Sequence, residues 1–207
     1  MPSSSRFWKC SLLLFMPMLL QAGDGRQRYY NALSGDISPQ RDIAIEYYRS
    51  DGAGADTPTH QIWLVSTLDP SKRRLLFTHW RDASLLFSDD EKWLVINDRQ
   101  ASNESHLQLF YRESELEYEK VTDLSEAAWH FFDEKQRHNW KDGFDHHYVE
   151  ALRWSDSTPP TLLLMLRGHV DSRNHTSDWY CLYDVEAKSF STDFEAHNRK
   201  STKVETE

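Results

Sequence analysis

A pattern of turns and strands recurs three times along the chain and constrains its fold more than any other feature. Each unit has a serine-led polar turn, an apolar strand, a polar loop, a second strand rich in aromatic residues, and another turn. The serine-led turns are Ser38–Asp42, Ser88–Lys92 and Ser155–Pro159, and their first residues are about 50 and then about 67 residues apart. A period of this length with several strands per unit is typical of β-propeller blades. The pattern predicts a mainly β chain with about three blade-like units.

The segments between these turns have the composition of β-strands. The second strands of the units are Gln61–Val65, Gln108–Tyr111 and Trp179–Tyr183, which are rich in β-branched and aromatic residues. The run Thr161–Leu166 is almost continuously apolar and has the length of a buried strand. We therefore expect a β-rich repeat domain over residues 37–195, arranged as an antiparallel meander.

One segment departs from the β pattern. Apolar side chains recur at helical spacing from Leu124 to Phe132. Asp123 or Ser125 could cap the start of a helix, because both side chains accept hydrogen bonds from free backbone amides. The sequence thus predicts a helical insertion near residues 123–137. Its length accounts for the longer interval between the second and third units.

The middle unit resembles the repeats of TolB-type β-propellers. Residues Phe87–Val95 are similar to the Ser-Pro-Asp-Gly turn and following apolar strand of that family. His106–Tyr111 together with Lys120–Thr122 is similar to its outer hairpin. Asp89 and Glu91 stand where the family's turn has Pro and Gly. The resemblance covers about 130 residues and implies a binding platform, with no catalytic residue carried over.

Three units are too few to close a propeller ring, which usually has four to eight blades. A fourth unit around residues 115–147, an open propeller, or association between chains would each resolve this mismatch. The edge strands of an open sheet carry unpaired backbone groups that can pair with another chain. Self-association through open sheet edges is therefore one expected mode of partner binding.

The N-terminal segment has the parts of a secretory signal peptide. Two positive charges precede the apolar run Cys10–Leu20, and small and polar residues follow it. The run has about 11 residues, fewer than the roughly 20 that a helix needs to cross a bilayer, so we expect no stable membrane span. We predict a signal peptide over residues 1–23, a linker over 24–36, and a secreted or periplasmic protein. Residues 196–207 are charged without an apolar pattern, which predicts a disordered tail.

Charge and cysteine content narrow the expected partners. The chain has a formal net charge of −9, and loss of a leader with two positive charges would bring it to about −11. Nucleic-acid binding requires clustered lysines and arginines, so no nucleic acid is expected as a partner. Loss of Cys10 would leave Cys181 as the sole cysteine, so the fold must rest on its core. A buried, inert thiol in a strand is expected for Cys181.

The densest group of potential metal ligands follows the predicted helix and comprises His138, Asp142, Asp145 and His146. Imidazole and carboxylate groups are the ligands that zinc and similar divalent ions accept. On a strand, His146 and His147 would face opposite sides, so both could not readily bind one ion. The sequence therefore contains one candidate metal site. The alternative interpretation is a solvated polar loop whose histidines bind no metal.

Two hypotheses about function follow from these patterns. The first is an exported, non-catalytic binding protein without a cofactor, whose partner is a protein, a peptide or a saccharide. The second is a small exported hydrolase or metal-binding protein that uses the His/Asp loop at residues 138–150. The sequence has no Gly-x-Ser-x-Gly elbow, phosphate-binding glycine loop or His-Glu-x-x-His motif, and this favours the first hypothesis.

Overall fold

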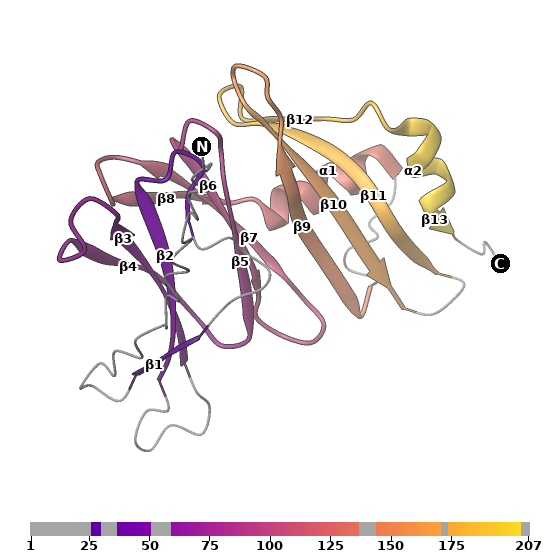
Figure 1. The fold of residues 1–207 in the computed structure, drawn as a ribbon. Coiled ribbons are helices and arrows are strands. Elements are labelled where there is room, and N and C mark those ends of the chain that lie inside the picture. Colours follow the sequence, from indigo (N-terminus) through magenta and orange to yellow (C-terminus); the bar gives the residue numbers. More distant parts are fainter. Residues whose placement is uncertain (1–25, 30–36, 51–58, 137–143, 171–173, 204–207) are drawn as a thin grey trace, which may run out of the picture.

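Three antiparallel sheets stand side by side in the computed structural model, as Figure 1 shows. The structure describes residues 26–29, 37–50, 59–136, 144–170 and 174–203. The first sheet contains β1 (Arg26–Tyr29), β2 (Ile43–Ser50), β3 (Thr59–Ser66) and β4 (Arg73–His79). The second contains β5 (Asp82–Phe87), β6 (Trp93–Arg99), β7 (His106–Arg112) and β8 (Tyr118–Asp123).

The third sheet contains β9 (His146–Trp154), β10 (Thr161–His169), β11 (His175–Asp184) and β12 (Ser189–Ser191), and β13 (Thr202–Lys203) also pairs with β11. In the first two sheets, and from β9 to β12 in the third, the strands follow one another in chain order, as in a propeller blade. The prediction of a mainly β chain with three blade-like units is therefore confirmed. The stack of sheets stays open, and the described part of residues 115–147 contains no fourth sheet.

The three serine-led turns share one hydrogen-bonding pattern. In each turn the serine hydroxyl accepts a bond from the backbone amide of the residue that starts the next strand segment. The serine's own amide donates to that residue's carbonyl. The N–Oγ distances are 3.2 Å for Ile43 to Ser38, 3.0 Å for Trp93 to Ser88 and 2.9 Å for Thr161 to Ser155. The repeat in the sequence is thus a repeated turn, in which serine satisfies a backbone donor.

A buried charged network joins the first two sheets. Glu91 adopts a left-handed backbone conformation with φ 56°, which favours glycine, yet its side chain is fully buried. One carboxylate oxygen accepts the amide of Gln40 at 2.7 Å, and the other accepts Nη1 of Arg112 at 3.0 Å. Nη2 of Arg112 also donates to Asp42 at 3.4 Å. These bonds tie the turns of both sheets to one guanidinium.

The pKa values of the two carboxyl groups in this network, Glu91 and Asp42, are shifted in opposite directions. Loss of water and the nearby Asp42 carboxylate raise the pKa of Glu91 above its ordinary value. The hydrogen bond with Glu91 and the charge of Arg112 lower the pKa of Asp42. Apolar side chains from both sheets complete this junction, among them Ile45, Ile62, Leu94 and Ile96.

The second and third sheets meet mainly through neutral hydrogen bonds in the described residues. His147 Nε2 and Glu104 Oε2 also lie 3.9 Å apart at this junction. The side chain of Asn97 donates to the carbonyl of Ala151 at 3.0 Å and accepts its amide at 2.8 Å. Ser105 makes the same pair of bonds with Val149, both at 2.8 Å. Both partners lie on β9, so side chains of the second sheet satisfy the edge of the third.

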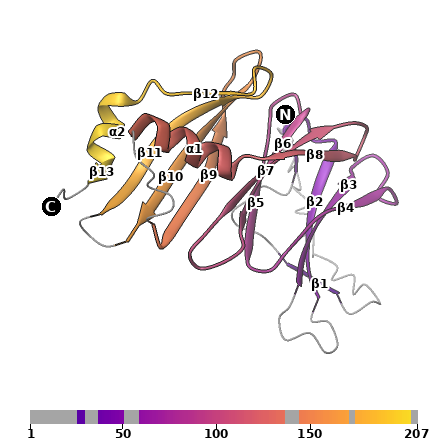
Figure 2. The same ribbon diagram turned by 180° about the vertical axis from the view of Figure 1, so that it is seen from behind.

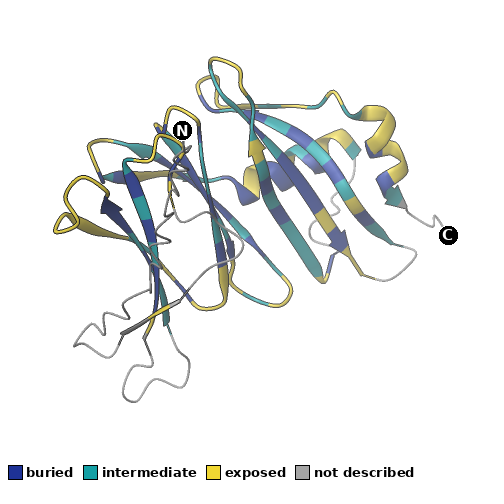
Figure 3. Cartoon of the chain, viewed as in Figure 1, coloured by how far each residue is buried: buried dark blue, intermediate teal, exposed yellow. Residues whose placement is uncertain are grey.

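Helix α1 (Ser125–Gln136) covers one face of the third sheet, as Figure 2 shows. Its buried side chains Ala128, Trp129 and Phe132 join the core that the second and third sheets share. The ring of Phe132 meets Trp179 of β11 edge-on with centroids 5.0 Å apart. Figure 3 shows buried residues, in dark blue, along the central strands of the sheets. The predicted helix is therefore confirmed, although it starts at Ser125 because Asp123 ends β8.

The structure describes regular elements in two segments for which the sequence predicts none. The segment 24–36, expected to be a linker, contains β1, which pairs with β2. The segment 196–207, expected to be disordered, contains most of helix α2 (Glu195–Ser201) and β13. The Asn198 side chain stabilises α2 by accepting the Tyr180 amide at 2.9 Å and donating to the Tyr180 carbonyl at 2.8 Å. Because α2 is held to β11 by a polar side chain, its sequence shows no apolar periodicity that would predict a helix.

The single thiol of the described chain has the environment expected for it. Cys181 lies in β11 and is fully buried, and loss of water raises its pKa to about 12. A thiol with such a pKa stays protonated and inert near neutral pH. No helix in the described residues is long and apolar enough to cross a membrane.

Candidate functional site

The histidines of the strands all lie near strand ends on the same edge of the stack, the lower edge in Figure 1. They are His60, His79, His106, His146, His147, His169 and His175. Strand register pairs His60 with His79 in the first sheet and places His169 between His146 and His175 in the third. The third sheet thus presents a row of imidazoles from three adjacent strands.

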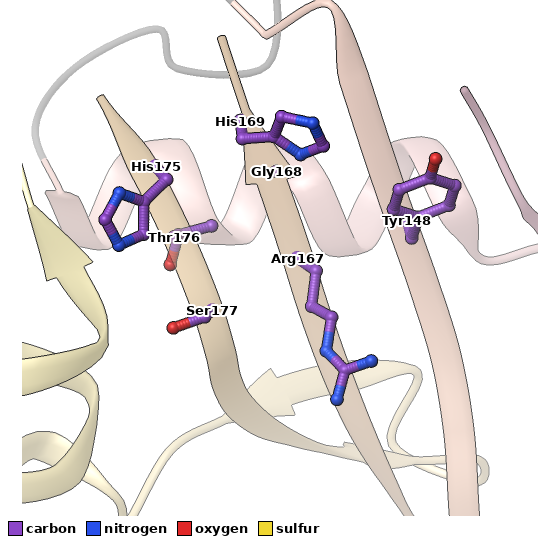
Figure 4. A pocket seen from close by; sticks show the side chains of 7 residues that line it. All are labelled: Tyr148, Arg167, Gly168, His169, His175, Thr176 and Ser177. Atoms are coloured by element: carbon purple, nitrogen blue, oxygen red, sulfur yellow. The ribbon is translucent and has the colours of Figure 1, made fainter. Parts of the chain in front are cut away.

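A cavity of about 580 Å³ opens beside this row on the face of the third sheet opposite α1 (Figure 4). Its lining residues come from β9, β10 and β11, and they are Tyr148, Arg167, Gly168, His169, His175, Thr176 and Ser177. Figures 1 and 2 together show α1 behind the sheet and no described element across the pocket face. This pocket is the candidate functional site.

The sheet beneath the pocket is closely packed. A Cβ atom at Gly168 would lie 2.2 Å from the Phe144 ring, so only glycine lets that ring pack against the strand. Phe144 in turn contacts Trp129 of α1 with ring centroids 6.0 Å apart. The hydroxyl of Tyr148 donates to the carbonyl of Ser102, which ties the pocket wall to the second sheet. The side chains that line the pocket therefore stand on a well-supported floor.

Arg167 is held in place by a neighbouring carboxylate. Its Nε and Nη2 atoms lie 2.9 Å and 2.8 Å from the same oxygen of Asp178. The edge of the guanidinium that carries Nη1 has no hydrogen-bond partner among the described residues. A planar guanidinium fixed along one edge can still bind an oxyanion through the other.

The imidazoles of the pocket are partly ordered by contacts with one another. The rings of His146 and His169 stack with centroids 4.5 Å apart and an interplanar angle of 9°. His169 is exposed, whereas Nδ1 of His175 is buried without a hydrogen-bond partner in the described residues. Ring nitrogens of either tautomer can bond a ligand as donor or acceptor.

The predicted metal ligands do not converge in the part of the chain that the structure describes. His138 and Asp142 lie outside the described residues, and Asp145 is exposed just before β9. The ring of His146 lies parallel to that of His169, so their in-plane lone pairs cannot point at one ion. His147 faces the other side of the sheet, near Trp129, which confirms the prediction that His146 and His147 diverge.

Within the described ranges, no group of three histidine, cysteine, aspartate or glutamate side chains is placed to hold a metal ion. The pocket instead uses residues that sequence reasoning missed, above all Arg167, His169 and His175. The local sequence signal for this pocket was a pair of histidines, His169 and His175, on either side of the loop between two predicted strands. Their approach to Tyr148 depends on strand register.

A second polar cluster lies at the same edge of the second sheet. Nδ1 of His106 is 3.3 Å from a carboxylate oxygen of Asp123, and register places Asp98 opposite His106. Asp98 is buried, its Oδ1 lacks a partner among the described residues, and loss of water raises its pKa. Desolvation opposes ionisation of Asp123 too, but hydrogen bonds from Ser125 and His106 lower its pKa overall.

The chain matches no protein-family model, and no curated protein is significantly similar to it in sequence. What the chain does must therefore be interpreted from the geometry and chemistry of its own residues.

Proposed function

We propose that this chain is an exported, non-catalytic binding protein that recognises its partner at the pocket of the third sheet. The observation that carries the proposal is the cavity of about 580 Å³ on the face of that sheet opposite α1. Ligand sites are typically concave and combine apolar and aromatic walls with a few oriented polar groups. Tyr148, Arg167 and His169 supply that combination.

The strands that carry the pocket lining, and the aromatic core packed behind them, favour recognition of a partner by preformed side chains. Its lining stands on strands, which hold side chains more precisely than loops do. Trp129, Phe132 and Trp179 pack directly behind the sheet and are fully buried. A preformed site loses little conformational entropy when it binds, so even a modest contact area can give useful affinity.

Export and the class of partner rest on the sequence. The N-terminal charges, apolar run and small residues support secretion or a periplasmic location. The acidic balance of the chain disfavours nucleic acid and favours a protein, peptide or saccharide partner. Resemblance of the middle unit to TolB-type repeats supports the same role, because such repeats serve as binding platforms.

The test is capture of a partner by three forms of the full-length chain, expressed in its own host and cross-linked before purification. His169→Ala removes an exposed imidazole from the pocket, and His130→Ala removes an exposed imidazole from the far side of α1 as a matched control. The proposal predicts the same specific partner with the wild type and His130→Ala, and its loss with His169→Ala. Equal recovery from all three forms would contradict the assignment of the site.

Export has its own test. N-terminal sequencing of protein from the secreted or periplasmic fraction is expected to find a chain that starts near Asp24. An uncleaved chain confined to the cytoplasm would refute this part of the proposal.

A further inference from the structure

The lining of the pocket differs in charge from the rest of the chain. The chain has 33 acidic and 24 lysine or arginine side chains. Among the residues that the structure describes, the lining contains one arginine, two histidines and three hydroxyl-bearing side chains, and no carboxylate. The hydroxyls of Tyr148 and Thr176 are already bonded to Ser102 and Thr202. In an acidic protein, the described lining thus offers hydrogen-bond donors from Arg167, the two histidines and Ser177, and such donors are the complement of an oxyanion ligand.

The arginine is oriented for such a ligand. Asp178 holds the Nε and Nη2 edge of Arg167, so the guanidinium cannot rotate freely. The Nη1 edge remains for a carboxylate, which can accept two parallel hydrogen bonds from a planar guanidinium. A ligand carboxylate would therefore meet a preformed partner.

The spacing of the donors indicates what carries the carboxylates. Arg167 and His169 are two positions apart on β10 and both line the pocket, as Figure 4 shows. Alternate residues of a strand lie about 6.5 to 7 Å apart, and the side chains of an extended peptide repeat at the same interval. His175 on the neighbouring strand lies opposite His169, so a second carboxylate near His169 could reach two imidazoles.

We infer that the pocket binds an extended acidic segment of a polypeptide partner, with carboxylates at alternate positions. Arg167 takes one carboxylate, and His169 with His175 takes the next. This inference rests on the proposed function and names the chemistry that the partner presents.

Calorimetric titration of the full chain with a blocked Glu-Ala-Glu-Ala-Glu peptide tests the inference. Blocked Gln-Ala-Gln-Ala-Gln is the neutral control. The acidic peptide is expected to bind, and its affinity is expected to fall about tenfold or more in Arg167→Gln, because hydrogen bonds between charged groups are the strong ones. Arg153→Gln, which removes an exposed arginine of β9 outside the pocket lining, is expected to change it less than about twofold.

Each other outcome overturns part of the account. Equal binding of the neutral peptide, or no effect of both Arg167→Gln and His169→Gln on the acidic peptide, would refute carboxylate recognition here. Tighter binding of acetate or of an oligogalacturonate than of the peptide would replace the polypeptide by a free anion or a saccharide. Capture of a partner that depends on His169, without any binding of the acidic peptide, would refute this inference and leave the proposed function standing. Binding of the acidic peptide that depends on Arg167, without any partner capture that depends on His169, would refute the proposed function. It would also refute the acidic partner segment that rests on that function, and would leave only carboxylate binding by the pocket.

Discussion

The two junctions between neighbouring sheets are built from different chemistry. The first and second sheets are joined by the ionisable network of Glu91, Arg112 and Asp42, in addition to apolar packing. The second and third are joined by neutral hydrogen bonds from Asn97 and Ser105, in addition to the helix core. The difference teaches that the sheet that carries the pocket is docked mainly by neutral hydrogen bonds and apolar packing, whereas the first sheet is attached through a buried charged network as well. The titratable pair at the second junction, His147 Nε2 and Glu104 Oε2, is 3.9 Å apart.

This contrast has an energetic basis. A buried ion pair roughly balances the cost of desolvating its members, but removal of one member leaves an uncompensated charge. A hydrogen bond between neutral groups contributes less and depends little on pH. Changes at the two junctions should therefore differ in both size and pH dependence.

The largest effect is expected in the core of the second junction. Phe132→Ala removes a fully buried ring between α1 and the third sheet and should reduce the free energy of unfolding by about 4 kcal/mol. The partly buried neighbour Phe131 offers a matched control, and Phe131→Ala should cost about half as much. Urea unfolding measures both. A loss below about 1 kcal/mol for Phe132→Ala would show that the helix is not part of the junction.

Loss of the guanidinium should break the first junction. Arg112→Met leaves the buried Glu91 carboxylate without its counter-charge, and we expect a loss of about 3 kcal/mol. Arg74→Met removes an arginine whose pair with Glu117 is largely exposed, and it should change stability by less than about 1 kcal/mol. Similar losses from both variants in urea unfolding would contradict a special role for the buried network.

The neutral hydrogen bonds of the second junction should contribute less. Asn97→Ala leaves the amide and carbonyl of Ala151 unpaired and should cost about 2 kcal/mol. Ser84→Ala removes only a single bond to Asn97, at 3.2 Å, and should cost about 1 kcal/mol or less. The loss from Asn97→Ala should be equal at pH 5 and pH 8. If the stability lost in Asn97→Ala differed between the two pH values, the second junction would not be the pH-independent one.

The smallest effect is a response of the first sheet to acid. Burial lowers the pKa of His79 from its ordinary value of 6.5 to about 4, because the neutral ring is favoured in the folded protein. His79 therefore contributes stability that is present above pH 6.5 and is lost as the pH falls toward 4. Between pH 7 and 4.5 the wild type should lose roughly 1.5 kcal/mol more than His79→Leu, after allowance for solvent screening.

Glu91 should act in the opposite direction over the same interval. Its pKa is raised, so the folded state binds a proton more readily than the unfolded state does. Its contribution is largest at low pH and is lost as the pH rises through the folded pKa. Acidification from neutral pH should therefore favour the wild type over Glu91→Gln. An opposite slope in thermal unfolding would show that Glu91 stays charged in the fold.

The sequence revealed those parts of the fold that local chemistry determines. Ser38, Ser88 and Ser155 are visible because each makes a hydrogen bond within its own turn. The helix is visible because its buried side chains follow the period of a single element. Glu91 lies in a polar turn of the sequence, and nothing nearby in the chain indicates its burial or its bond to Arg112.

The pocket could not be read in the same way. His146 lies far from His169 and His175 in the chain, and only the register of β9, β10 and β11 brings them together. A shift by one residue would send every side chain to the other face, and composition does not determine register. The sequence thus singled out His146, whose stacking partner His169 in the structure is not among the companions predicted for it. Two of those companions, His138 and Asp142, lie outside the described residues.

Hydrogen exchange of the free chain and of the chain with its captured partner tests the central claim most directly. Amide exchange on binding is expected to slow in Arg167–His169 and His175–Ser177 and to stay unchanged in β2–β4 of the first sheet. Protection confined to the first sheet, with no change on β10 and β11, would contradict the claim that the third sheet carries the binding site.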